Sequence, residues 1–84
     1  MKLLKFYGEW CGPCKTQNSI IKNLGTKVNI AIEEIDIDEH LDKARSWQVT
    51  TVPTLILVNE DGEIKRHTGV LKEKQFLEFI ENAA

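Results

Sequence analysis

The stretch Trp10-Cys11-Gly12-Pro13-Cys14 decides the fold that the sequence predicts. A short apolar run at residues 3–7 precedes it and is typical of a buried strand. Residues 11–24 carry apolar side chains at helical spacing, and Pro13 falls in the first turn, where its missing N–H costs nothing. A CxxC pair between a buried strand and a helix is the context expected of redox-active cysteines.

The two cysteines are the only thiols of the chain, and one helical turn separates them, so they can close a disulfide. Cys11 begins the predicted helix, where unpaired N–H groups and the helix dipole stabilise a thiolate. We therefore predict that Cys11 is the nucleophile that attacks a substrate disulfide. Cys14 lies deeper and should be less exposed, and it would resolve the mixed disulfide.

A CxxC pair also has plainer interpretations, namely half of a zinc site or two unrelated buried thiols. Pro13 favours a rigid turn over a metal-binding knuckle, and neither His40 nor His67 lies at a short spacing from the cysteines. Two thiols are too few for an iron–sulfur cluster. We expect no metal and no separate cofactor, the redox-active group being the Cys11–Cys14 disulfide.

Composition narrows the class of protein. The 84 residues are 42% hydrophobic and 29% charged, which predicts one globular domain over residues 1–84. A net charge of -2 gives no basic footprint for nucleic acid, and no apolar run is long enough for a membrane span. Without a recognisable signal peptide, we expect the chain to remain in the cytoplasm.

The rest of the chain alternates between strand and helix patterns, so the predicted order is β-α-β-α-β-β-α. The first β-α-β unit requires a parallel pair of strands, and the last two strands form a hairpin. We predict an α/β fold with a mixed four-stranded sheet and helices on both faces. The remaining elements are strands at 28–37, 54–58 and 63–67, helices at 39–47 and 72–82, and a turn at 59–62.

Four separated pieces of the sequence resemble the thioredoxin family: residues 9–15, the Val52-Pro53-Thr54 segment, residues 59–63 and Gly69. Their spacing also fits, so the resemblance covers nearly the whole chain. The dipeptide between the cysteines is typical of thioredoxins rather than glutaredoxins. The resemblance implies a thioredoxin-like fold and a reductant of disulfide-containing client proteins, with a thioredoxin reductase as electron donor.

The resemblance also implies a cis Val52–Pro53 bond that places the Val52 backbone beside Cys11, where an extended substrate could bind. The alternative is a trans proline that opens a strand. For Trp10 we weigh core packing against a place on the docking surface, and favour the surface, whereas Trp47 is assigned to packing. The predicted substrate-binding residues are Trp10, Gly12, Pro13, Val52, Pro53, Gly69 and Val70.

The sequence departs from the family pattern at its start, because the usual N-terminal strand and helix are lacking. The strand at 28–37 would then be an exposed edge, which predicts a less stable fold. We expect a monomer, with pairing of two copies along this edge as the alternative. The polar residues at 16–18 of the first helix are a further difference, which we interpret as a change in client docking.

A second departure is an exchange of charges. Lys5 stands where the family usually has a buried aspartate, and Glu34 where it usually has a lysine. A lone buried ammonium is costly, so Glu34 is expected to pair with Lys5. The hypothesis is that Glu34, or a neutral Lys5, takes the proton of Cys14, and the alternative is that both are solvated strand residues.

Two other functions stay open at this point. A glutaredoxin-like, glutathione-dependent oxidoreductase would fit the short chain but not the Gly-Pro dipeptide. A redox-inactive binding module of the same fold would need neither cysteine. His40 follows an acidic segment, which we interpret as a helix start favoured by the dipole rather than as a metal site.

Overall fold

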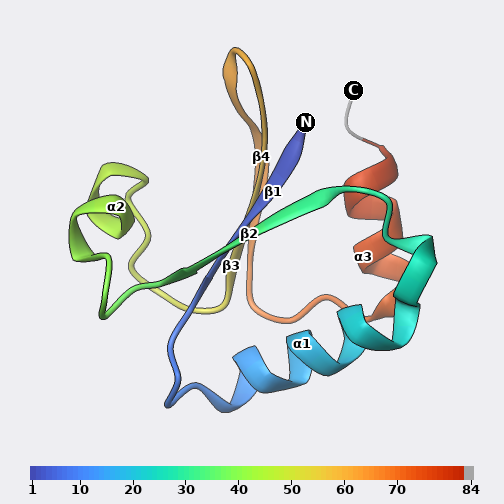
Figure 1. Ribbon diagram of the computed structural model, residues 1–84, viewed down its shortest axis with the longest axis horizontal. Helices are drawn as coiled ribbons and strands as arrows, with labels where there is room; N and C mark the ends of the chain where they lie inside the picture. The colour runs from blue at the N-terminus through green and yellow to red at the C-terminus, as the bar shows by residue number, and fades with distance from the viewer. Residues whose placement is uncertain (83–84) are drawn as a thin grey trace.

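The computed structural model describes residues 1–82 and has the predicted order of elements (Figure 1). Residues 1–82 form four strands, three α-helices and a short 3₁₀ helix, and α3 follows the last strand. The strands are β1 (Lys2–Tyr7), β2 (Ala31–Asp36), β3 (Thr54–Asn59) and β4 (Gly62–Thr68), and the helices are α1 (Gly12–Leu24), η1 (Gly25–Lys27), α2 (Leu41–Ser46) and α3 (Glu73–Glu81).

The strands form one four-stranded sheet in the order β2-β1-β3-β4. β1 pairs in parallel with β2 and antiparallel with β3, and β3 and β4 form an antiparallel hairpin. The mixed sheet is therefore confirmed, as is the position of β2 at its edge. Gly62 closes the hairpin with a φ of 123°, a backbone conformation that glycine adopts without strain.

Helices cover both faces of the sheet, as predicted. The alternation of side chains along each strand explains this arrangement, because successive residues point to opposite faces. On one face α1 and α3 pack over a cluster built around Leu3, Leu55 and Phe76. On the other face α2 packs over Phe6 and Ile56 through Ala44, and Trp47 joins this cluster, as its assignment to packing predicted.

The element boundaries differ from the predicted ones most clearly in β2. The predicted strand began at residue 28, whereas β2 begins at Ala31. Val28 and Ile30 instead pack against the α1–α3 cluster, so their apolar pattern reflects burial rather than strand pairing. Gly25 ends α1 as predicted and donates its N–H to the carbonyls of the last turn. None of the helices within residues 1–82 is both long and apolar enough to cross a bilayer.

Candidate active site

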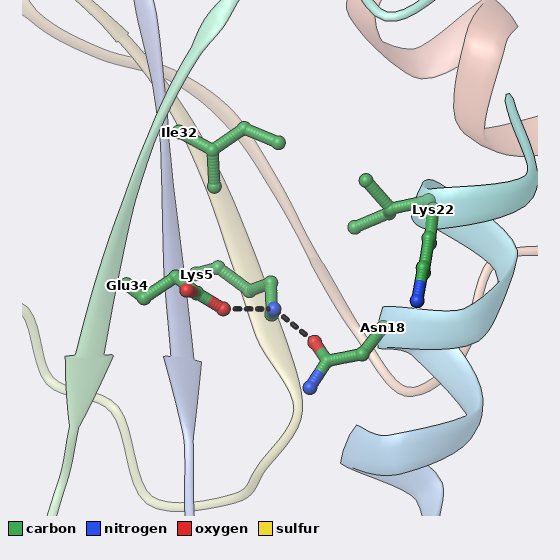
Figure 2. A pocket seen from close by; sticks show the side chains of 6 residues that line it. Lys5, Asn18, Lys22, Ile32 and Glu34 are labelled. Carbon is green, nitrogen blue, oxygen red and sulfur yellow. Dashed lines mark hydrogen bonds and ion pairs between the residues drawn. The ribbon is translucent and has the colours of Figure 1, made fainter. Parts of the chain in front are cut away.

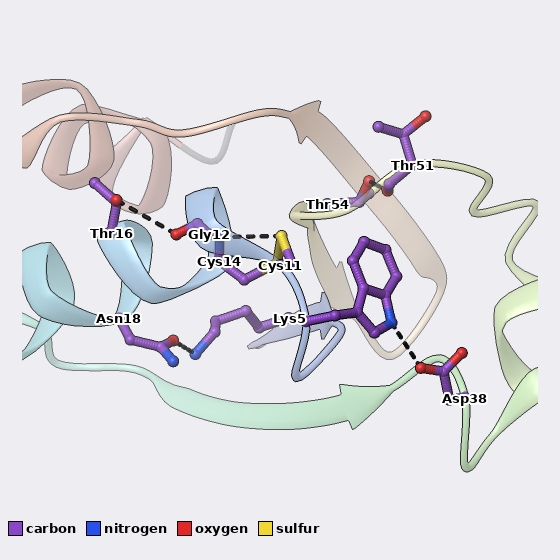
Figure 3. The surroundings of a disulfide bond; sticks show 10 residues. Lys5, Cys11, Gly12, Cys14, Thr16, Asn18, Asp38, Thr51 and Thr54 are labelled. Atoms are coloured by element: carbon purple, nitrogen blue, oxygen red, sulfur yellow. Dashed lines mark hydrogen bonds between the residues drawn. A yellow bond between two sulfur atoms is a disulfide. The ribbon is translucent and has the colours of Figure 1, made fainter.

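The two cysteines lie where β1 has ended and α1 begins, and they are joined as a disulfide (Figure 3). Cys11 occupies the N-cap position of α1 with extended backbone angles, and the Cα atoms of Cys11 and Cys14 are 5.2 Å apart. The backbone N–H of Cys14 donates to Cys11 Sγ at 3.1 Å. A sulfur in this position accepts a hydrogen bond from one of the N–H groups that have no partner within the first turn of the helix.

The local charges also favour a thiolate at Cys11. The first turn of α1 contains no acidic residue, so no neighbouring carboxylate on that turn opposes a negative sulfur. The two cysteines differ less in exposure than predicted, because Cys11 is 3% exposed and Cys14 is 1% exposed. Their position on the helix therefore distinguishes them, since only Cys11 stands at the N-cap.

The segment before β3 lies near the disulfide, and Figure 3 includes Thr51 and Thr54 in its surroundings. The Val52–Pro53 bond is cis, as the resemblance implied. Thr54 Oγ1 donates to the Thr51 carbonyl at 2.5 Å, which closes the segment around the cis bond. The N–H of Gly69 donates to the Pro53 carbonyl at 2.8 Å, so the loop after β4 is held against the same segment.

Trp10 is exposed rather than packed in the core, as predicted, with 66% of its surface accessible. Its Nε1–H donates to Asp38 Oδ2 at 2.7 Å, and Figure 3 marks this bond. Gly8 lies under the indole: a Cβ atom added there would be only 2.7 Å from the ring. Gly8 and Asp38 thus hold the indole next to Cys11, and neither role could be assigned from the sequence pattern.

The other residues predicted to bind substrate are partly accessible. Gly12 and Pro13 are exposed, while Val52, Gly69 and Val70 are half-buried. Pro53 differs from the prediction of an apolar contact surface, because its side chain is fully buried. Within the Val52–Pro53 pair, the valine rather than the proline ring is accessible to solvent.

Lys5 is buried between the sheet and α1 and pairs with Glu34 across the β1–β2 register (Figure 2). The distance from Lys5 Nζ to Glu34 Oε1 is 2.6 Å, and the two side chains are 4% and 56% exposed. Lys5 Nζ also donates to Asn18 Oδ1 of α1. These groups line an open pocket of about 250 Å³. The predicted pair is therefore formed, with only the lysine buried.

Tyr7 follows Lys5 on the same face of β1, and the Lys5 ammonium lies 5.9 Å from its ring centroid. Burial raises the pKa of Tyr7, and the negative charge of Asp36 raises it further. The phenol therefore stays protonated at neutral pH and does not act as an anionic base near the cysteines.

The role of Gln17, one turn after Cys14, was not predicted from the sequence. Its side chain is fully buried and forms two hydrogen bonds with the backbone of Leu71. Asn18 likewise bonds to Lys5. Thr16 Oγ1 donates to the Gly12 carbonyl at 3.4 Å, so all three polar side chains of residues 16–18 make internal hydrogen bonds. The interpretation of these residues as a change in client docking stays a prediction. Leu71 and Lys5 lie far from Gln17 and Asn18 in the chain, so no local pattern indicated these two partners.

The histidines lie outside this arrangement. His40 precedes α2 and His67 packs edge-on against Phe79, with ring centroids 6.5 Å apart. Over residues 1–82, His, Cys, Asp and Glu side chains do not gather in groups of three that could hold a metal ion. The chemistry that the described site offers is that of two thiols at the start of a helix.

Comparison with known proteins agrees with this geometry. The family model described as Thioredoxin matches residues 1–82. The thioredoxin of Chlamydia pneumoniae is 41% identical over 76 residues, which are 89% of this chain and 74% of that protein. Two solved structures have the same fold. A mutant thioredoxin from Halobacterium salinarum has a TM-score of 0.87 and 31% identity, and the match covers 96% of this chain and 72% of that one. Thioredoxin 1 from Thermosipho africanus has a TM-score of 0.82 and 30% identity, and the match covers 98% of this chain and 92% of that one. With its paired cysteines at the start of α1, the chain therefore belongs to the thioredoxin family and is a dithiol–disulfide oxidoreductase.

Proposed function

We propose that the protein reduces disulfides of client proteins, with Cys11 as the attacking thiolate and Cys14 as the resolving thiol. The observation that carries this assignment is the N–H of Cys14, which donates to Cys11 Sγ at 3.1 Å. The same N–H would stabilise the Cys11 thiolate in the reduced protein. Cys14 lies inside the helix and has no comparable position.

The reaction consists of two exchanges. The Cys11 thiolate attacks one sulfur of the client disulfide, a Cys11–client disulfide forms, and the other client sulfur leaves as a thiolate. Cys14 then loses its proton and attacks Cys11 Sγ, which releases the second client thiolate and forms the Cys11–Cys14 disulfide. The client gains two electrons and this protein loses two. Because Cys14 is held one turn away, the second step is unimolecular.

The accessible residues around Cys11 support docking of an extended client segment. Trp10 and Pro13 are exposed, and the half-buried Val52 and Val70 add apolar contact. The backbone of Val52 would offer strand-like hydrogen bonds to the client. A thioredoxin reductase would return two electrons to the disulfide, and the cytoplasm is the compartment where such a reductant is needed.

We further propose that the pair of Lys5 and Glu34 serves the proton of Cys14. Lys5 is buried on the face of the sheet that α1 covers, and its only carboxylate partner in the described chain is Glu34. Glu34, or Lys5 in its neutral form, would accept the proton when Cys14 attacks. The open pocket beside them would let the proton pass on to solvent.

The proton role is tested by comparing Glu34→Gln with the unmodified protein between about pH 6 and pH 9. The expected result is a shifted pH profile of turnover. Glu33→Gln is the matched control, because Glu33 lies next in sequence but pairs with Lys2 and Lys43 instead. An unchanged profile in Glu34→Gln would remove this role.

The main assignment is tested by insulin reduction with dithiothreitol as electron source. Cys11→Ser is expected to abolish activity, whereas Cys14→Ser is expected to accumulate a mixed disulfide with the client, visible by mass spectrometry. Trapping through Cys14 in the Cys11→Ser protein would reverse the two roles. The electron donor is identified by comparing NADPH with thioredoxin reductase against glutathione, and activity with glutathione alone would favour the glutaredoxin-like function.

A further inference from the structure

Gln17 is a buried polar residue whose side chain engages a single distant residue. It is fully buried on the inner face of α1, one turn beyond Cys14. Its Nε2 donates to the Leu71 carbonyl at 3.1 Å, and its Oε1 accepts the Leu71 N–H at 2.7 Å. The amide thus bonds to both backbone groups of a residue 54 positions away.

A buried amide carries a desolvation penalty that its hydrogen bonds must offset. An apolar side chain would fill the space between α1 and the loop without the desolvation penalty of a buried amide. Leu71 lies in the connection between β4 and α3, outside any regular element, so its N–H and carbonyl need partners. Two directional hydrogen bonds fix the distance between α1 and the loop and the orientation of the loop. Apolar packing constrains both less strictly.

The loop is also held at its other end. The N–H of Gly69 donates to the Pro53 carbonyl at 2.8 Å. Gly69 has a φ of 101°, and the chain bends at this attachment point. Val70 lies between the two attachment points and is half-buried. Hydrogen bonds therefore connect α1, the cis-proline segment and the loop that carries Val70.

We propose that Gln17 is a positioning residue for client recognition: it sets Val70 relative to Cys11 before a client binds. The proposal rests on the function proposed above, in which Val70 contributes to the docking surface. A loop that is ordered in advance lowers the entropic cost of binding a protein substrate. A small disulfide that needs only Cys11 would not use this contact.

The test compares Gln17→Met with the unmodified protein on two substrates. Met has similar length and removes both hydrogen bonds. We expect the KM for insulin to rise roughly fivefold, the change that corresponds to one net hydrogen bond. The rate with 5,5′-dithiobis(2-nitrobenzoic acid) should stay within about twofold, because this small disulfide needs no docking loop. Asn23→Leu is the control, since Asn23 is an exposed amide on the same helix.

The outcomes are distinguishable. An unchanged KM for insulin in Gln17→Met overturns the positioning role and leaves the proposed function intact. An equal loss with both substrates also overturns it, because the effect would then be on the fold or the cysteines. If the unmodified protein reduces neither substrate, the proposed function fails first and the positioning role falls with it.

Gln17→Glu keeps the test decisive if Gln17→Met does not fold. A protonated carboxyl can donate to the Leu71 carbonyl and accept its N–H, whereas a carboxylate can only accept. As the pH is raised, the introduced carboxyl ionises, and its infrared band reports this in the same samples. The ratio of the KM for insulin of Gln17→Glu to that of the unmodified protein should rise over the same pH range. A constant ratio through that ionisation overturns the proposal.

Discussion

The two faces of the sheet bury different kinds of side chain. Under α2, the cluster consists of apolar residues such as Phe6, Ile35 and Ile56. Under α1, the sheet and helix bury the ammonium of Lys5 and the amide of Gln17 next to an apolar cluster. The helix that carries the cysteines thus lies over the side of the sheet that buries an ammonium and an amide, whereas the buried hydroxyl of Thr54 lies on the α2 side.

This difference separates stability from function. Apolar packing under α2 lowers the free energy of the fold through burial alone. Lys5 and Gln17 each require hydrogen-bond partners from another element to offset desolvation. Side chains that cost stability are retained where their chemistry or position is used. On this basis, we interpret the α2 face as supporting the fold and the α1 face as holding the groups that we propose to serve the disulfide.

Adjacent glutamates of β2 show the same division. Glu34 points toward α1 and pairs with the buried Lys5. Glu33 points to the other face and bonds to Lys2 and to Lys43 of α2. In the Lys5–Glu34 pair the lysine is buried, whereas the side chains of Lys2, Glu33 and Lys43 are each 33% exposed or more. Alternation along one strand therefore sends Glu34 to the buried Lys5 on the α1 face and Glu33 to exposed lysines on the α2 face.

The largest expected effect would come from breaking the apolar face. Ile56→Ala removes a fully buried side chain of the α2 cluster and should lower the free energy of unfolding by about 2–5 kcal/mol. Urea denaturation measures this loss, and Ile56→Val should cost only about 0.5–1.5 kcal/mol. The folded fraction should keep its specific activity on insulin. A loss of specific activity in folded protein would contradict the division between the faces.

A smaller effect of opposite sign is expected on the other face. Lys5→Met removes a buried charge and leaves Glu34, which is more than half exposed and can be hydrated. We expect stability to rise by about 1 kcal/mol while turnover falls. Lys22→Met, at an exposed lysine of the same pocket, should change stability by less than about 0.5 kcal/mol. A destabilised Lys5→Met protein would show that the pair supports the fold instead.

The smallest expected effect concerns acid stability. Hydrogen bonds from Lys2 and Lys43 lower the pKa of Glu33 from its ordinary 4.5 to about 2. A carboxyl with a lowered pKa in the folded state stabilises it fully above about pH 4.5, and this contribution is lost as the pH falls toward 2. Solvent screening keeps it below about 1 kcal/mol. Urea denaturation at falling pH should show a component that Glu33→Gln lacks and that salt reduces. An identical acid profile in Glu33→Gln would contradict it.

Much of the fold could be predicted because its signals are local. The apolar run before Cys11, the helical spacing after it and Gly62 at the hairpin each act within a few residues. The pairing of Lys5 with Glu34 was one of two alternatives that the sequence left open, and the structure contains the pair. The start of β2 was misplaced because burial of Val28 imitates the pattern of a strand.

The roles of Gly8 and Gln17 could not be foreseen in the same way. Position 8 leaves no room for a side chain, because the Trp10 ring lies over it. Gln17 resembles an ordinary polar residue of a helix until Leu71 is brought beside it. In both cases the role of the residue depends on the partner that it contacts, and only the folded chain shows which partner that is.

By itself the sequence determined the order of the elements, the two reactive sulfurs and their place at the start of a helix, because periodicity, glycine, proline and cysteine spacing act over short distances. Only the tertiary structure decided which polar side chains are buried, what satisfies them and how the loop at Val70 is held to α1 and to the cis-proline segment. The physical reason is that burial and hydrogen bonding depend on residues that are distant in the chain and adjacent only after folding.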